Sequence, residues 1–214
     1  MSPSDISRGY FITLEGGEGA GKTTQISRLK DLLADQGIEV LTTREPGGSE
    51  GAEQIRALLV NGDPGRWDSM TETLLHFAAR RDHVEKVVKP ALADGKWVIS
   101  DRFADSTMAY QGYGHGLGVE TISRVYDIVL ADFKPDLTIV LDLDVEAGLG
   151  RALSRSGGED RYERMEIEFH RQLRQGFQEI ARKDPERCAL IDASGDADSV
   201  FTLLSGVVRD RLLD

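Results

Sequence analysis

Short apolar runs alternate with longer amphipathic stretches along the chain. A short run that is almost wholly apolar is typical of a strand buried on both faces of a parallel sheet. Five runs fit this pattern: Tyr10–Glu15, Val40–Arg44, Lys96–Asp101, Asp136–Asp142 and Cys188–Asp192. The stretches between them have helical periodicity and cover about residues 21–36, 50–61, 67–93, 119–131, 145–155, 162–183 and 196–212.

This alternation of strands and helices predicts the fold class. Parallel strands need long crossover connections, which are usually helices packed on the faces of the sheet. We therefore expect an α/β fold of three layers, with a doubly wound, five-stranded parallel sheet. No internal repeat or low-complexity linker divides the sequence, so residues 1–214 are expected to form one domain.

Two stretches are polar and rich in glycine. They are Gln111–Gly118 and the stretch from Ser154 to Asp160. On composition alone, each is typical of a surface loop. The second follows the fourth predicted strand, and its place relative to the motifs below indicates a more specific role.

A phosphate-binding motif follows the first predicted strand. Gly16-Gly-Glu-Gly-Ala-Gly-Lys22-Thr23 fits the pattern G-x-x-x-x-G-K-[ST], and a predicted helix follows it. Its glycines let successive backbone N–H groups point at one anion, to which the helix adds its positive N-terminus. The motif predicts an ATP or GTP site made by Gly16, Gly17, Glu18, Gly19, Ala20, Gly21, Lys22, Thr23 and Thr24. Lys22 would reach the β- and γ-phosphates, and the Thr23 hydroxyl would bind Mg²⁺.

Charge and composition narrow the class of partner. The formal net charge of −11 argues against a broad nucleic-acid surface, which needs a basic patch. No apolar run reaches the roughly 18 residues that span a bilayer, and the first ten residues lack the features of a signal peptide. The single cysteine, Cys188, is compatible with a reducing cytosol. We expect a cytoplasmic protein without a nucleic-acid or membrane partner.

Several classes of phosphate-loop protein do not fit. A Ras-like GTPase needs an Asn-Lys-x-Asp segment, which the chain lacks. The Ser-Gly-Gly of a transporter ATPase occurs at residues 156–158, but it follows the Asp142 strand instead of preceding it. A kinase and a nucleotide-binding module without turnover both stay open on the loop alone.

Four further segments resemble the bacterial thymidylate kinases in order and spacing. They are Thr43-Arg-Glu-Pro-Gly-Gly48, Leu74-Leu-His-Phe-Ala-Ala-Arg80, the Asp101-Arg-x-x-x-Ser-x-x-Ala-Tyr-Gln-Gly112 segment, and the arginines Arg151, Arg155 and Arg161. The resemblance extends from about Tyr10 to Asp192 and implies a nucleoside-monophosphate kinase with a lid at about residues 150–162. It further implies transfer of phosphate from Mg·ATP to dTMP for dTTP synthesis.

The same resemblance implies the residues that hold dTMP. Arg102 and Arg44 would contact its phosphate, because a guanidinium binds phosphate oxygens bidentately. Arg80 would contact thymine, and Tyr110 would pack against the deoxyribose and leave no room for a 2′-hydroxyl. The remaining expected contacts are Glu18, Pro46, Ser106, Thr107 and Gln111.

Catalysis is expected to depend on positioning and charge, because the acceptor phosphate needs no dedicated base. Thr23 would bind Mg²⁺, and Asp101 would help to hold the metal through water or would orient the acceptor. Some thymidylate kinases carry an arginine after the loop carboxylate, but Gly19 follows Glu18 here. The resemblance then implies that Arg151, Arg155 and Arg161 of the lid act on ATP. The implied catalytic residues are Glu18, Lys22, Asp101, Arg102 and Arg155.

One position departs from the family pattern. Most members have a thymine-stacking phenylalanine four residues before the helix arginine, where this chain has His76, followed by Phe77. Either side chain could take that role. Three alternatives also stay open: a kinase for dUMP or CMP, a deoxynucleoside kinase, and a non-catalytic module. Family members are commonly homodimers, so a homodimer is expected here too.

Overall fold

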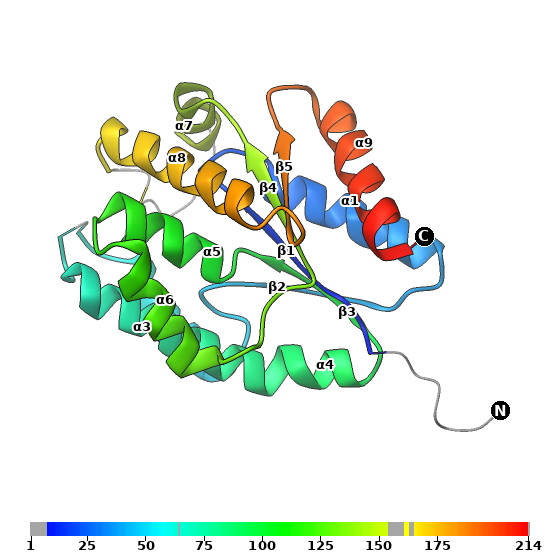
Figure 1. The fold of residues 1–214 in the computed structure, drawn as a ribbon, viewed down its shortest axis with the longest axis horizontal. Helices are drawn as coiled ribbons and strands as arrows, with labels where there is room; N and C mark the ends of the chain where they lie inside the picture. Colours follow the sequence, from blue (N-terminus) through cyan, green and yellow to red (C-terminus); the bar gives the residue numbers. More distant parts are fainter. Residues whose placement is uncertain (1–7, 64, 154–160, 163–164, 214) are drawn as a thin grey trace.

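A parallel five-stranded sheet forms the centre of the molecule (Figure 1). The structure is a computed structural model that describes residues 8–63, 65–153, 161–162 and 165–213. The strands are β1 (Phe11–Gly16), β2 (Val40–Arg44), β3 (Trp97–Asp101), β4 (Leu137–Asp142) and β5 (Cys188–Asp192), in the order β2-β3-β1-β4-β5. The five predicted strands are confirmed, each to within one residue at either end.

Helices cover both faces of this sheet. They are α1 (Lys22–Asp35), α2 (Glu50–Val60), α3 (Ser69–His83), η1 (Val84–Val88), α4 (Lys89–Ala93), α5 (Ala104–Thr107), η2 (Met108–Gly114), α6 (Val119–Leu130), α7 (Val145–Leu153), α8 (Ile167–Lys183), α9 (Ala197–Val208) and η3 (Arg209–Leu213). The η segments are wider, π-helical turns. The predicted helix over 67–93 is confirmed as α3, η1 and α4 in succession, whereas the last predicted helices begin later, at Ile167 and Ala197.

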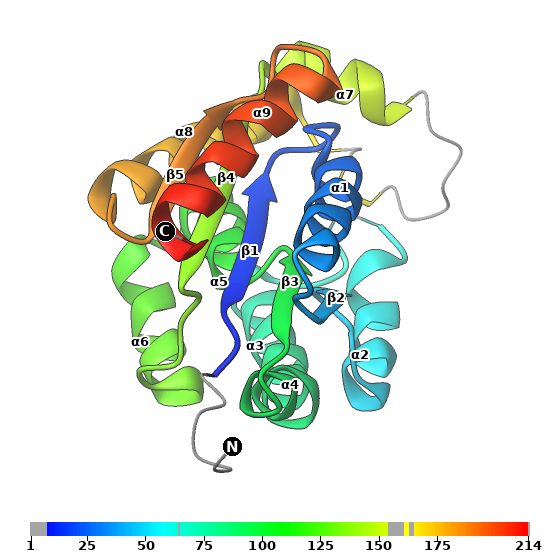
Figure 2. The same ribbon diagram turned by 90° about the vertical axis from the view of Figure 1, so that its right-hand side faces the viewer.

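Each face of the sheet has its own apolar layer, and Figure 2 shows the helices that cover the two faces. On one face, Leu29 of α1 and Leu204 of α9 pack in the same cluster as Ile12 and Ile139 of the sheet. The opposite face carries two clusters, one built around α3, η1 and α6 and one around α8 and η2. The α/β fold of three layers is therefore confirmed.

The strand register brings the ends of three strands together. β1 lies between β3 and β4, and Arg44 at the end of β2 is level with Asp101 at the end of β3. The phosphate loop leaves β1 at the same edge. Ligands of such sheets bind at the carboxyl ends of the strands, so the fold concentrates the motif residues in one place.

The glycine-rich stretch at 111–118 is only partly a loop. Residues up to Gly114 belong to η2, and Gln111 and Gly112 are buried. Helix α8 packs closely on this segment: a Cβ added at Gly176 would lie 2.9 Å from the Tyr113 ring, and one at Gly114 would lie 2.6 Å from the Phe169 ring. The glycines here permit close packing, which composition alone does not distinguish from a flexible loop.

Candidate active site

The phosphate loop connects β1 to α1. Gly19 and Gly21 have φ angles of 68° and 91°, in the left-handed region that favours glycine. A Cβ at Gly19 would lie 2.0 Å from the Gly148 carbonyl oxygen, so no larger residue fits there. Lys22 is buried, and its Nζ donates to the carbonyl oxygens of Gly16 and Gly17 at 3.0 Å. The loop thus holds its lysine beside the N-terminus of α1.

The two residues predicted to bind the metal lie together. The Thr23 hydroxyl donates to Asp101 Oδ2 at 3.4 Å, from the first turn of α1 to the end of β3. Both supply oxygen ligands of the kind that Mg²⁺ prefers. Among the described residues, no group of three or more His, Cys, Asp and Glu side chains could hold a metal ion. A metal here would take its remaining ligands from phosphate oxygens and water, as is usual for Mg²⁺.

Arg102, Glu18 and Tyr110 form a second cluster beside the loop. Arg102 has a φ of 70°, an unusual value for a residue with a side chain. Its Nη2 donates to Glu18 Oε1 at 2.8 Å, and the Tyr110 hydroxyl donates to the same oxygen at 2.6 Å. Burial alone would raise the pKa of Glu18, but the charges of Arg102 and Lys22 outweigh it and lower that pKa to about 2. Glu18 is therefore an anion that holds Arg102 and Tyr110 in place.

Sequence reasoning missed Glu15, the last side chain of β1 before the loop. It is fully buried and accepts hydrogen bonds from the Phe103 N–H at 2.7 Å and the Ser106 hydroxyl at 2.5 Å. Burial, followed by the charge of Asp105, raises the pKa of Glu15 to about 7. A carboxylate at the end of an otherwise apolar strand was the signal that could have found it.

A cation-rich cavity opens in front of the strand ends. Its lining includes four arginines and three carboxylates: Arg44, Arg56, Arg102 and Arg161, with Glu18, Glu45 and Asp101. Arg44 is half exposed and pairs with Glu53 at 3.2 Å. Several guanidinium groups around one cavity favour an anionic ligand such as a phosphate.

A second cavity continues from the first into the interior. Its lining includes nearly all the residues predicted to hold dTMP except Arg44 and Phe77, namely Glu18, Pro46, His76, Arg80, Arg102, Ser106, Thr107, Tyr110 and Gln111. Phe77 is 1% exposed and packs in the core, edge-on against the Tyr126 ring. Of the two candidates for the stacking position, only His76 lines this cavity.

Two polar atoms in the wall of this cavity lack a partner among the described residues. Arg80 donates through Nε to Glu45 and through Nη2 to the Phe103 carbonyl and the Thr107 hydroxyl, which leaves Nη1 unpartnered. Gln111 Nε2 donates to Glu72 at 2.7 Å, and its Oε1 is unpartnered. Because a carboxylate only accepts, the Glu72 contact fixes which amide atom of Gln111 is the oxygen. Two residues of the wall therefore each keep one unused hydrogen-bonding atom, a donor on Arg80 and an acceptor on Gln111.

Comparison with known proteins agrees with this geometry. The family profile of thymidylate kinase matches residues 14–203. The chain belongs to the thymidylate kinase family. The thymidylate kinase of Caulobacter vibrioides is 53% identical over 207 residues, which cover 97% of this chain and 99% of that protein. That of Jannaschia sp. is 50% identical over 204 residues, covering 95% and 98%.

A solved structure supports the same assignment. The crystal structure of thymidylate kinase from Ehrlichia chaffeensis matches with a TM-score of 0.76 at 37% identity, covering 94% of this chain and 99% of that one. The match extends over nearly the whole of both chains, so the two chains share one fold.

Only two of the three arginines predicted for the lid lie in the described part of the structure. Arg151 lies on the exposed side of α7, and Arg155 lies outside the described residues. Arg161 is only 3% exposed, pairs with Glu72 and donates to the Leu59 and Asp63 carbonyls. The side chain borders the cation-rich cavity on the α2–α3 side, and its contact with ATP stays a prediction. Glu72, Leu59 and Asp63 lie about 90 residues or more earlier in the chain, so local sequence gave no sign of these three contacts.

Sequence reasoning also missed Tyr162. Its hydroxyl lies 3.1 Å from His76 Nε2, and its ring packs edge-on against Tyr110 at 5.3 Å between centroids. Burial, and then the charges of Arg80 and Arg161, lower the pKa of His76 to about 3, so the imidazole is neutral.

No helix of the described ranges is long and apolar enough to cross a membrane.

Proposed function

We propose that the two cavities hold dTMP, with its phosphate in the cation-rich cavity and its base in the inner one, and that the chain transfers the γ-phosphoryl group of Mg·ATP to that phosphate. The single observation that carries the proposal is the pair of unpartnered atoms, Arg80 Nη1 and Gln111 Oε1. Thymine offers O4 as an acceptor and N3–H as a donor, which complements this pair. Cytosine offers an amino donor and a bare ring nitrogen, which would leave both protein atoms facing a like group.

Uracil has the same hydrogen-bonding edge as thymine. Discrimination between dTMP and dUMP then depends on the 5-methyl group, which a pocket distinguishes by only about 1–3 kcal/mol. A kinase for dUMP remains the nearest alternative, whereas the hydrogen-bonding wall argues against CMP.

The acceptor phosphate would be held by arginines. Arg102 and Arg44 lie at the ends of neighbouring strands, and their guanidinium groups would bind its oxygens. Arg161 borders the same cavity and would add positive charge. Tyr110, fixed by Glu18, would pack against the sugar, and Ser106, Thr107 and Pro46 would surround the base.

The donor site would be the phosphate loop. Gly16 to Thr24 would bind the ATP phosphates, with Lys22 at the β- and γ-oxygens. Thr23 and Asp101 would hold Mg²⁺, directly or through water; when bound, the metal supplies positive charge that offsets the charge of the phosphates. Arg151 and Arg155 of the lid would act on ATP. We also propose a homodimer and a cytoplasmic location with a role in dTTP synthesis, as for the family in general.

The first test is ADP formation from Mg·ATP in a coupled assay, with dTMP, dUMP, TMP, dCMP, GMP and thymidine as acceptors. We expect a dominant rate with dTMP that collapses in Arg102→Ala. A dominant rate with dCMP or GMP would overturn the assignment of the base pocket. No rate with any acceptor, despite tight ATP binding, would favour a non-catalytic nucleotide-binding module.

A further inference from the structure

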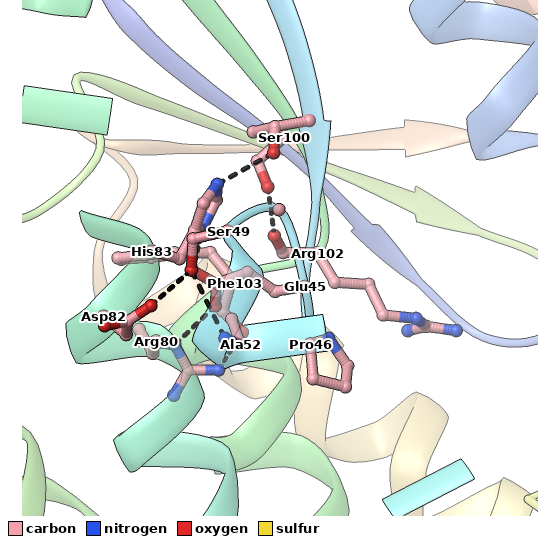
Figure 3. A network of polar contacts seen from close by, with 12 residues as sticks. Glu45, Pro46, Ser49, Ala52, Arg80, Asp82, His83, Ser100, Arg102 and Phe103 are labelled. Carbon is pink, nitrogen blue, oxygen red and sulfur yellow. Dashed lines mark hydrogen bonds and ion pairs between the residues drawn. The ribbon is translucent and has the colours of Figure 1, made fainter. Parts of the chain in front are cut away.

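Glu45 lies at the junction of the acceptor cavities without a role in the proposal above. It follows the last residue of β2, is 4% exposed, and its carboxylate lies between Arg80 and His83 of helix α3 (Figure 3). Oε2 accepts from Arg80 Nε at 2.7 Å, and Oε1 lies 2.9 Å from His83 Nδ1. A carboxylate this deeply buried is stable only when it is paired and hydrogen-bonded, and both oxygens are.

We infer that Glu45 and His83 form a positioning pair that fixes the Arg80 guanidinium with Nη1 toward the base, and that they thereby determine which pyrimidine the site accepts. The inference rests on the proposed function, because it assigns Arg80 to base recognition. Neither Glu45 nor His83 needs to touch the reacting atoms. Their effect would pass through Arg80.

The hydrogen bonds that Arg80 makes support this role. The guanidinium has five N–H donors in a rigid plane. Glu45 engages Nε, and the Phe103 carbonyl and the Thr107 hydroxyl engage Nη2 at 3.1 and 3.0 Å. The Phe77 ring lies against the guanidinium, 4.8 Å from the ring centroid to Cζ. Contacts on three sides define one orientation of the plane, and the Nη1 donors are those left for a ligand.

His83 in turn fixes Glu45. Because the carboxylate only accepts, Nδ1 of His83 carries the proton in this contact. Nε2 of a neutral ring is then an acceptor, and the Thr43 hydroxyl lies 2.8 Å from it. His83 is fully buried, and a Cβ at Gly48 would come within 2.5 Å of its Nε2. The ring is therefore held on both nitrogens and by packing.

The alternation of side chains along β2 connects this pair to the phosphate cavity. Successive side chains of a strand point to opposite sides, so Thr43 and Glu45 face α3 while Arg44 points away from it. Arg44 lines the cation-rich cavity, and the Glu45 N–H donates to the Asp101 carbonyl at 2.9 Å. Base and phosphate recognition thus depend on three consecutive residues.

A purely structural network would hold α3 against residues 43–49 without affecting recognition. The two roles predict different measurements. A structural role lowers the unfolding temperature and leaves the affinity for dTMP and the choice of base unchanged. A positioning role changes the KM and Kd for dTMP and the preference over dCMP, while kcat and the KM for ATP change little.

The experiment compares Glu45→Gln and Thr43→Val with the wild-type chain. Glu45→Gln retains the shape of the side chain and removes the charge opposite Arg80. Thr43→Val removes only the partly exposed hydroxyl that lies next to His83, at the end of the hydrogen-bonded series Thr43–His83–Glu45. We expect Glu45→Gln to raise the Kd and KM for dTMP about tenfold and to narrow the dTMP-to-dCMP ratio of kcat/KM by a similar factor. Thr43→Val should raise the Kd and KM for dTMP and narrow the dTMP-to-dCMP ratio of kcat/KM, each by about threefold, with kcat nearly unchanged.

The matched control is Asp82→Asn. Asp82 lies on α3 next to His83 and accepts from the Ser49 hydroxyl at 2.6 Å, so it joins the same helix to the same segment without contacting Glu45 or Arg80. We expect its Kd for dTMP, measured by calorimetry, to equal that of the wild type. Unchanged dTMP affinity and base preference in folded Thr43→Val and Glu45→Gln would overturn the inference. Failure of the wild-type chain to bind dTMP would instead overturn the proposed function on which it rests.

Discussion

Glu15 and Glu18 are three residues apart, yet their surroundings shift their pKa values in opposite directions. Glu18 faces Arg102 and Lys22, which lower its pKa to about 2. Glu15 is enclosed beneath the loop, where burial and the Asp105 charge raise its pKa to about 7. The loop residues between them therefore separate an anion that faces the ligand from a carboxyl group that holds the backbone of Phe103 and Ser106.

The raised pKa of Glu15 predicts a pH dependence of stability. The folded state binds this proton more tightly than the unfolded chain, whose pKa is near 4.5. Its stabilising effect is complete below about pH 4.5 and is lost as the pH rises through about 7. In Glu15→Gln this contribution is absent. We expect the free energy of unfolding of the wild type, relative to Glu15→Gln, to fall from about pH 5 to about pH 8 in urea titrations. Parallel curves for the two proteins would contradict the shift.

Gln111 allows a direct test of base recognition. Gln111→Leu keeps the approximate volume but removes the acceptor that would receive N3–H, and it leaves Glu72 with one partner fewer. We expect kcat/KM for dTMP to fall about tenfold to a hundredfold, because a buried polar group is left unpaired in the complex. Steady-state kinetics check this, with the exposed Gln175→Leu as the control. An unchanged kcat/KM would remove Gln111 from the base site.

Among individual residues, the sequence identified the members of the motifs but not the residues that hold them in place. Lys22, Asp101 and Arg102 stand in recognisable patterns, and the strand ends bring them together. Glu45 and Glu72 support the site through partners 35 to 89 residues away, and such pairings depend on the helix packing. For the same reason the sequence could not choose between His76 and Phe77: a small rotation of α3 decides which side chain faces the cavity.

Among the elements, α3 places two residues, His76 and Arg80, in the wall of the inner cavity and ends at His83. Its N-cap is Asp68, whose side chain accepts from the N–H groups of Met70 and Thr71. The predicted helix over 67–93 located this element correctly. The sequence did not show its division into three segments, because an amphipathic pattern continues through the wider turn at Val84–Val88.

The N-cap of α3 predicts a change in stability with little change in recognition. Asp68→Ala leaves two backbone donors without their partner and should lower the free energy of unfolding. Asp68→Ser retains a capping oxygen and should restore most of the loss. Denaturant titration checks the stability, and the Kd for dTMP should stay within about twofold, since the first turn lies away from Arg80. A loss of dTMP affinity equal to that of Glu45→Gln would show that α3 acts as one rigid unit.

In the molecule as a whole, the strand order β2-β3-β1-β4-β5 places the phosphate loop next to the end of β3. β1 delivers the phosphate loop, and its neighbour β3 delivers Asp101 and Arg102. Neighbouring strands lie about 4.8 Å apart, so the sheet itself sets the distance between the phosphate loop and the Asp101-Arg102 segment. The apolar runs predicted five parallel strands, but their order follows from crossover connections whose packing partners the runs do not specify.

Ligand binding should stabilise the whole chain. A ligand at a hundred times its Kd adds about 2.7 kcal/mol to the stability, which for a protein of this size raises the Tm by about 5–11 °C. We expect this shift with dTMP in thermal unfolding, and a much smaller one with thymidine, which has no phosphate for Arg102 and Arg44. Equal shifts with both would indicate that the cation-rich cavity does not hold the acceptor phosphate.

The close contact of α8 with η2 has a consequence for how this family varies. Gly176 is a helical residue without a left-handed φ, and the three nearest atoms that a Cβ there would meet all belong to the Tyr113 side chain. Substitutions at these two positions should therefore be correlated among relatives: alanine at 176 should accompany a smaller residue at 113, and glycine should accompany an aromatic one. Positions 113 and 176, which are far apart in the sequence, would then change together because the contact between η2 and α8 can hold only one large side chain.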